Sequence, residues 1–376
     1  MVTCVLTPRA LSFPLMAKAY YTCNLLPTEL LSRCGYVARW LGNHLQDPAA
    51  PARRDALGVH PMTCPYVTRL VVAADMLLDG APDGDCLLVP GGCDAMRRMG
   101  DLLAATYPDR VFVLPMPRSS GDGVVRTLAA DLLRMESWLR ERLESAAPPD
   151  GARPEEGVAP ETDLREATAP GPAPGQEPSG VDYPSPPRPG GVFVVAGPLS
   201  DASLLELIDR LGGGIAGLES CTSPERWKPL VVGAPGTAAD KGGEAGGQAG
   251  GEAGDDHVAL AARLLDIGMC PRRSTADRRA HLARRLDESR PSSVIYARQS
   301  FCDPGAYDAL AVAALAEERG LPYLEIEVGF PFEPGGPLRT RVEAFLEAQS
   351  LDDDLLDDDL VDDAGFTGDD PGDGEA

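Results

Sequence analysis

The chain has 376 residues, with 41 Gly, 36 Pro and a formal net charge of −24 at pH 7, a length that accommodates two globular domains plus unstructured segments. So negative a chain is a poor nucleic-acid binder, because affinity for phosphates comes largely from Lys and Arg. No apolar run approaches the ~18 residues of a membrane helix, and we expect a cytoplasmic protein that binds neither nucleic acid nor membrane.

Most of the negative charge lies in three segments of low complexity. Residues 146–190 carry −5 and are rich in Pro, residues 234–257 carry −4 and are rich in Gly, and residues 351–376 carry −12. Such compositions bury too little apolar surface to offset the chain entropy lost on folding. We therefore expect a disordered linker over 146–190, a disordered insertion over 234–257 and a disordered acidic tail over 349–376, with a nearly neutral folded part.

The first predicted domain spans residues 1–145, including an N-terminal helical segment. Its predicted elements are, in chain order, helices over 27–41 and 66–80, a strand over 86–90, a helix over 91–107, a strand over 110–117 and a helix over 123–145. The helices show apolar residues at helical spacing, and the strands are short apolar runs. The alternation of strand, helix and strand predicts a parallel βαβ unit.

The second predicted domain spans residues 191–348 and also alternates between the two kinds of element. Its predicted elements are a strand over 191–199, a helix over 200–213, an extended segment over 214–221, helices over 258–268 and 277–289, a strand over 292–298, a helix over 303–320 and a strand over 322–328. Parallel strands joined by right-handed crossovers are the default for such units. The sequence therefore predicts an α/β protein with two doubly wound parallel-sheet domains, Rossmann- or flavodoxin-like.

Three of the nine cysteines stand where an α/β sheet binds ligands. Cys93 and Cys302 each follow a predicted strand and precede a helix in a Cys-Asp pair, and Cys64 also opens a helix. Ligands gather beyond the carboxyl ends of parallel strands, and a helix N-terminus favours the thiolate that binds metal. Asp94 and Asp303 are predicted to cap the two helices. Three such thiolates suit a zinc ion or an iron–sulfur cluster with one metal position left open.

The remaining cysteines and histidines carry weaker signals. Cys86 inside a strand and Cys34 on a helix face are predicted to be core residues, whereas Cys23, Cys221 and Cys270 lie at element ends, where packing and ligand roles are both open. The four histidines show no metal spacing, with His257 in the predicted insertion. The sequence has no G-x-S-x-G, P-loop or G-x-G-x-x-G motif after a strand, so hydrolase, NTPase and dinucleotide-binding functions lack their usual machinery.

Four motifs follow one another along the chain: YYTCNLLPTELLSRCGYVARWLG, Cys64 with GGCDAMRRMGDLL, GVFVVAGPLSDASLLELIDRLGG followed by Cys221, and VIYARQSFCDPGAYDALAVAALAEERGLPYLEIE. Together, and in this order, they resemble the 2-hydroxyacyl-CoA dehydratase subunit family, which includes 2-hydroxyglutaryl-CoA dehydratase D-components and benzoyl-CoA reductase subunits. The resemblance runs from about residue 20 to about residue 330 and excludes the low-complexity linker and insertion.

The resemblance implies that Cys64, Cys93 and Cys302 ligate one 4Fe-4S cluster. It also implies a dimer with a homologous second subunit, a separate ATP-dependent activator protein that injects one electron, and an acyl-CoA substrate. In such hydro-lyases the thioester carbonyl is reduced to a ketyl radical anion that expels the neighbouring hydroxyl, so that 2-hydroxyacyl-CoA becomes enoyl-CoA. Two alternatives stay open: a related cluster-containing reductase of small molecules without a CoA substrate, and a non-catalytic partner or scaffold subunit.

Overall fold

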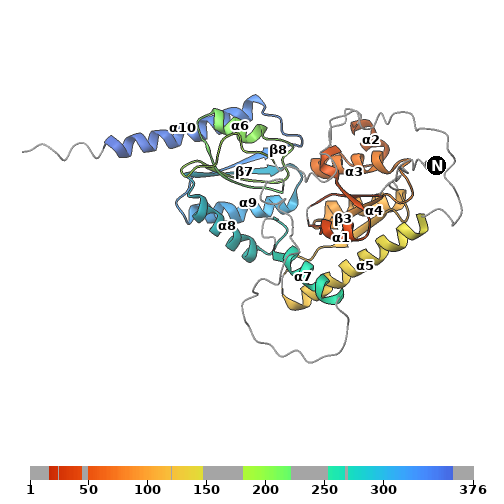
Figure 1. Ribbon diagram of the computed structural model, residues 1–376. Helices are drawn as coiled ribbons and strands as arrows, with labels where there is room; N and C mark the ends of the chain where they lie inside the picture. The colour runs from red at the N-terminus through yellow and green to blue at the C-terminus, as the bar shows by residue number, and fades with distance from the viewer. Residues whose placement is uncertain are drawn as a thin grey trace, which may run out of the picture.

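The protein contains two four-stranded parallel sheets, as seen in a computed structural model (Figure 1). The described residues are 17–23, 25–44, 50–119, 121–146, 181–221, 253–266 and 270–358. The first sheet consists of β1 (Lys18–Tyr21), β2 (Val37–Trp40), β3 (Cys86–Gly91) and β4 (Val111–Pro115), in the order β2-β1-β3-β4. The second consists of β5 (Val192–Ala196), β6 (Ile215–Glu219), β7 (Ser293–Gln299) and β8 (Tyr323–Val328), in the order β6-β5-β7-β8. The predicted fold class, an α/β protein with two parallel sheets, is thus confirmed.

Helices cover both faces of each sheet. Those of the first half are α1 (Thr28–Arg33), the 3-10 helix η1 (Leu41–His44), α2 (Ala50–Ala56), α3 (Pro65–Leu78), α4 (Asp94–Thr106) and α5 (Asp122–Ala146). Those of the second half are α6 (Ser203–Arg210), α7 (Ala253–Asp266), α8 (Thr275–Ser289), α9 (Asp303–Glu317) and α10 (Gly336–Asp358). No helix among the described residues is long and apolar enough to cross a membrane.

The central strands are buried on both faces, as expected for parallel sheets. In β3, Leu88 packs with residues of α1 and α5 on one face, and Leu87 and Val89 pack with residues of α3 and α4 on the other. The second sheet is built in the same way, between α6 and α10 on one face and α8 and α9 on the other. This burial explains why β3, β5 and β7 are visible in the sequence as continuous apolar runs.

The prediction of one helix over residues 27–41 is wrong. Helix α1 ends at Arg33, and Gly35 adopts φ +87°, a left-handed conformation that favours glycine. The chain then turns back into β2, which pairs in parallel with β1. The apolar residues on either side of Gly35 fit helical spacing by coincidence, since short apolar runs do not separate helix from strand. Strand β1 was not predicted at all.

Helix α7 corrects the predicted boundaries of the insertion. It begins at Ala253, so residues 253–257 are helical. Its apolar side chains belong to the core of the first domain, although they follow the second domain's strands in sequence; they are Leu260, Ala261, Leu264 and Leu265. Figure 1 shows α7 lying along α5. Amphipathic packing against another element stabilises such a helix, and composition alone does not reveal that partner.

The linker and the tail are also shorter than predicted. Residues 181–190, assigned to the linker, pack on the second domain: Val181 is buried, and the Tyr183 hydroxyl accepts a hydrogen bond from the Leu218 backbone N–H at 3.1 Å. Helix α10 continues to Asp358, so the first ten residues of the predicted tail are helical. The rest of the predicted linker, insertion and tail lies outside the described residues.

Candidate functional site

The two sheets turn the carboxyl ends of equivalent strands toward one another. Each sheet has the same strand order, and the third strand in chain order is β3 in one and β7 in the other. Cys93 follows β3 and Cys302 follows β7, at the point where strand order reverses and where doubly wound folds bind their ligands. The two Cys-Asp turns are therefore structurally equivalent, which their shared sequence pattern alone only suggested.

Each of the three predicted ligands is the N-cap of a helix. Cys64 precedes α3, Cys93 precedes α4 and Cys302 precedes α9. The prediction that Asp94 and Asp303 cap these helices is wrong, because both are the first helical residues and the preceding cysteines hold the cap positions. Their carboxylates instead lie in the first turn, where the positive end of the helix dipole favours negative charge.

The Cys64 and Cys302 thiols form a hydrogen bond to each other across the two domains. This bond lowers the pKa of Cys64 to about 7, although burial opposes the change, and the backbone N–H groups of Val67 and Tyr66 lower it further. The same bond, together with burial, raises the pKa of Cys302 well above its usual range. The two thiols therefore titrate together rather than independently.

Cys93 belongs to the same electrostatic neighbourhood. Burial raises the pKa of its thiol to about 11, and negative charge on Cys64 and Cys270 raises it further, while the backbone N–H groups of Met96 and Ala95 oppose the rise. Cys302 in turn interacts with both Cys64 and Cys93. The structure thus brings the three predicted site cysteines together, two in direct contact and the third within electrostatic range.

Cys23, Cys221 and Cys270, whose roles the sequence did not decide, lie near the three site cysteines. We call the space between the two domains at Cys64, Cys93 and Cys302 the crevice. The Tyr66 hydroxyl has a pKa raised well above its usual value, first by burial and then by negative charge on Cys23, Cys221 and Cys64. Cys270 acts in the same way on Cys93. Cys23 follows β1 and Cys221 follows β6, so their positions two residues beyond a strand were a signal that the sequence contained.

Cys34 and Cys86 occupy the core, as predicted. Both belong to the apolar cluster between the first sheet and α5. Burial raises the pKa of Cys86 to about 12 and also raises that of Cys34. Protonated, buried thiols of this kind act as small apolar side chains.

Arg272 is a site residue that the sequence analysis missed. It comes from the segment between α7 and α8, is 2% exposed, and donates from Nη1 to the Pro117 backbone carbonyl in the first domain. Its Cδ would lie 2.9 Å from a Cβ placed on Gly92, the residue before Cys93. Gly92 therefore has no side chain where the Arg272 side chain passes. A buried guanidinium side chain therefore lies beside the loop that precedes Cys93.

Further contacts hold the two domains against each other at this crevice. The rings of Tyr66 and Phe330 meet edge to face with centroids 5.1 Å apart. The Ser274 backbone N–H donates to the Arg118 carbonyl at 3.2 Å. The first of these contacts joins α3 to the loop after β8, and the second joins the loop after β4 to the start of α8.

A charged network is buried behind the crevice in the second domain. Arg278 on α8 donates to Glu219 at 2.6 Å and to both carboxylate oxygens of Asp308 at 3.0 and 3.1 Å. His281 Nε2 lies 3.0 Å from Glu219, and the Tyr296 hydroxyl donates to Asp308 at 3.1 Å. Each of these side chains is hydrogen-bonded to another member of the network. The network therefore fixes α8 and α9 on the sheet, and we do not regard it as a ligand-binding site.

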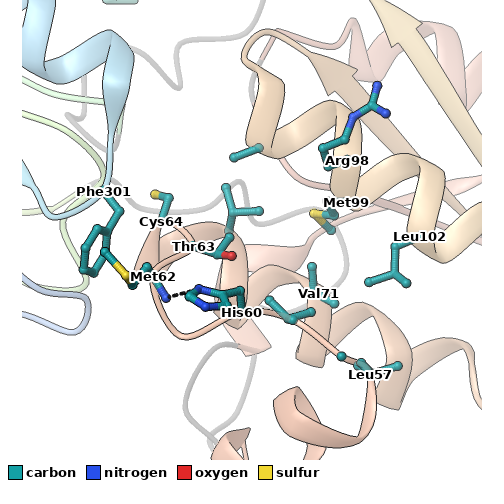
Figure 2. A pocket seen from close by; sticks show the side chains of 14 residues that line it. Leu57, His60, Met62, Thr63, Cys64, Val71, Arg98, Met99, Leu102 and Phe301 are labelled. Atoms are coloured by element: carbon teal, nitrogen blue, oxygen red, sulfur yellow. Dashed lines mark hydrogen bonds between the residues drawn. The ribbon is translucent and has the colours of Figure 1, made fainter.

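An apolar pocket of about 460 Å³ opens beside Cys64 (Figure 2). The segment before α3 contributes His60, Met62 and Thr63, and α4 contributes Met99 and Leu102. Phe301, the residue before Cys302, contributes a wall from the second domain. The pocket is therefore lined by Cys64 itself and by the residue that precedes Cys302.

Among the described residues, no group of three or more His, Cys, Asp or Glu side chains could hold a metal ion. The shared ligand role of Cys64, Cys93 and Cys302 stays a prediction. In the comparison with protein families, residues 192–348 match the family described as 2-hydroxyglutaryl-CoA dehydratase, D-component. This match begins at β5, ends within α10 and includes Cys302. Among curated proteins, none matches the chain.

Proposed function

We propose that the protein is a cluster-bearing subunit of a 2-hydroxyacyl-CoA dehydratase, because residues 192–348 match the family described as 2-hydroxyglutaryl-CoA dehydratase, D-component. The reaction removes water from a 2-hydroxyacyl-CoA to give an enoyl-CoA after activation by one electron. The observation that supports this proposal best is the convergence of three N-cap cysteines from two domains, with Cys64 and Cys302 hydrogen-bonded to each other.

The donor set fits a 4Fe-4S cluster better than a single metal ion. A cluster takes one thiolate at each of several iron atoms, so its ligands need not meet at one point. Each of the three thiols lies at a helix N-terminus, whose dipole favours the thiolate. Cys64, Cys93 and Cys302 would hold the cluster, which when bound supplies a low-potential electron and an iron position free of cysteine.

Other residues of the chain would shape the surroundings of the cluster. The aromatic pair Tyr66 and Phe330 closes the crevice between the domains and reduces access of water. Arg272 adds a fixed positive charge beside the Cys93 loop, which favours the negative charge that bound thiolates bring. Together these residues provide a dry, positively biased environment for a reaction in which charge builds up on the substrate.

Family membership also supports a homologous second subunit and a separate ATP-dependent activator as partners, because the matched family is named for one component of an enzyme. We place the reaction in the cytoplasm, where thiols stay reduced and available to iron. The nucleotide-binding motifs that an activator needs are absent from this sequence.

A second candidate function is a cluster-containing reductase that acts on small molecules without CoA. The observation that favours it is the presence of Cys23, Cys221 and Cys270 near the three predicted ligands. Six thiols are more than one 4Fe-4S cluster requires. A larger sulfur set holds more iron and so stores more electrons, which suits reduction rather than dehydration.

Anaerobic purification followed by iron and sulfide analysis tests the proposal. We expect about four iron atoms per chain and a broad visible absorption that is lost in Cys64→Ser, Cys93→Ser and Cys302→Ser. Cys86→Ser is the matched control, since Cys86 is a buried thiol of the same domain and should change packing without changing iron content. A wild-type chain that stays free of iron after reconstitution, or a Cys302→Ser variant that keeps it, would contradict the proposal.

The two candidates then differ in iron content and in substrate binding. Iron well above about four per chain, with no binding of any acyl-CoA to the intact cluster protein, favours the reductase. Binding of acyl-CoA together with about four irons favours the dehydratase.

A further inference from the structure

The pocket beside Cys64 has the size of a small-molecule site. Its volume of about 460 Å³ falls inside the roughly 300–1,000 Å³ common for such sites. Its walls come mainly from α3 and α4 of the first domain, with Phe301 added from the second. A ligand in this pocket would touch the residues that precede two of the site cysteines, Thr63 and Phe301.

The lining is mainly apolar, with His60, Thr63 and Arg98 as its polar side chains. Val67, Val71, Met99 and Leu102 form its helical walls. The Nδ1 atom of His60 already accepts a hydrogen bond from the Met62 backbone N–H at 3.1 Å. Among the described lining residues there is no acidic side chain. Such a surface attracts hydrocarbon and penalises charge.

Arg98 is the one described lining residue with a full positive charge, and it is poorly placed to neutralise a buried carboxylate. Its side chain is 76% exposed and forms an ion pair with Asp101 at 2.9 Å. In Figure 2 the guanidinium extends away from the other labelled side chains. An exposed, already paired guanidinium contributes little to binding a second anion.

We propose that this pocket binds the acyl end of the substrate and that the acyl group is apolar, without a second carboxylate. The inference rests on the proposed function, since it takes the pocket's neighbour Cys64 as part of the reaction site. A hydrocarbon end would cover Met62 and Phe301, which are 62% and 47% exposed, and would gain from their burial. A carboxylate end would lose its hydration in exchange for apolar walls.

Methionine methyl resonances offer a direct test on the full chain. Met62 and Met99 line the pocket, whereas Met116 and Met135 are buried in the first domain away from it. The protein is labelled with ¹³C at methionine methyl groups and titrated with 4-methylpentanamide or with glutaramate. The two probes share an amide carbonyl and a similar chain length, but one ends in an isopropyl group and the other in a carboxylate.

We expect 4-methylpentanamide to shift the Met62 and Met99 signals saturably and to leave those of Met116 and Met135 in place. Glutaramate should bind at least about tenfold more weakly, because its carboxylate would be buried without a partner. Leu102→Asn should weaken binding of 4-methylpentanamide several-fold, whereas Leu133→Asn, at an exposed leucine of α5, should not. Unchanged Met116 and Met135 signals show that each variant is folded.

Equal or tighter binding of glutaramate at Met62 and Met99, or no shift of either signal with 4-methylpentanamide, would overturn the inference. These outcomes are independent of the proposed function, which depends on iron content. A chain that binds 4-methylpentanamide but never takes up iron contradicts the dehydratase proposal and leaves the pocket's preference for apolar groups intact. A chain that takes up iron but prefers glutaramate contradicts only the apolar acyl assignment.

Discussion

The thiols of Cys64 and Cys302 form a hydrogen bond to each other across the boundary between two domains that lie far apart in the sequence. Each cysteine is the N-cap residue of a helix, α3 in one domain and α9 in the other. Because both helix N-termini point at the same crevice, the relative position of the domains decides whether the sulfurs can act together. Residues that hold the domains and their helices in place are therefore as important for the site as the cysteines, and the predictions below address them.

Replacing Arg278 by leucine should strongly destabilise the second domain. The substitution leaves Glu219 and Asp308 buried without their shared cation, a situation that costs about 3–5 kcal/mol in comparable ion pairs. Urea denaturation followed by far-ultraviolet circular dichroism measures the change. The neighbouring Arg279 pairs with Glu318 at the surface, so Arg279→Leu serves as the control and should cost less than about 1 kcal/mol. Equal effects of the two substitutions would contradict a structural role for the buried network.

Stability should fall at acid pH partly through Glu219. Burial alone would raise the pKa of this carboxyl, but His281 and Arg278 outweigh it, and the pKa lies below its usual 4.5. The unfolded state therefore takes up the proton at a higher pH than the folded state, so the stabilisation is complete above about pH 4.5 and is lost as the pH falls through the folded pKa.

Glu219→Gln removes this titration. The difference in unfolding free energy between wild type and Glu219→Gln should be larger at about pH 6 than at about pH 4 or below, measured by urea denaturation at both values. Glu206→Gln, at an exposed carboxylate paired with Arg210, is the control. Parallel loss of stability in wild type and Glu219→Gln as the pH falls would show that another group is responsible.

Leu264→Ala in α7 should destabilise the first domain, although Leu264 lies within the residues that match the dehydratase family. Its side chain is fully buried in the core with α5, and such truncations cost about 2–5 kcal/mol. Tryptophan fluorescence reports this change, because Trp40 and Trp138 both pack against that core. Val258 is a partly exposed residue of the same helix, and Val258→Ala should leave the fluorescence transition nearly unchanged. A transition unaffected by Leu264→Ala would mean that α7 does not stabilise the first domain.

Phe301→Gly should separate stability from ligand binding. Phe301 has φ +56°, a conformation that costs a non-glycine residue about 1–2 kcal/mol. Glycine removes this backbone strain from the folded state, but its greater conformational freedom also stabilises the unfolded chain, and the two effects oppose each other. We therefore expect the unfolding free energy to stay within about 1 kcal/mol of wild type, while binding of 4-methylpentanamide weakens several-fold. Tyr307→Ala, at a residue that is 76% exposed on α9 and does not line the pocket, should change neither quantity. Unaltered binding in Phe301→Gly would exclude Phe301 from the pocket wall.

Much of the second domain was predictable because its strands are buried on both faces. The middle of a strand such as β7, from Val294 to Ala297, is apolar because both faces of the sheet are covered. The strand is therefore recognisable in the sequence, and Cys302, shortly after its end, is recognisable with it. The same reasoning failed around Gly35, where the fold depends on a single left-handed residue. For α7 it predicted a helix over residues 258–268 but neither its start at Ala253 nor its packing on α5, which lies before the long linker in the sequence.

For the candidate site, too, some features could be predicted from the sequence and others could not. The sequence by itself determined that Cys64, Cys93 and Cys302 open helices after or beside strands, because local patterning specifies the ends of elements. Only the tertiary structure decided that Cys64 and Cys302 touch, that Cys23, Cys221 and Cys270 lie near them, and that Arg272 passes Gly92. These relationships join residues of separate elements, and no local signal encodes them, because their distances follow from how two independently built sheets pack against each other.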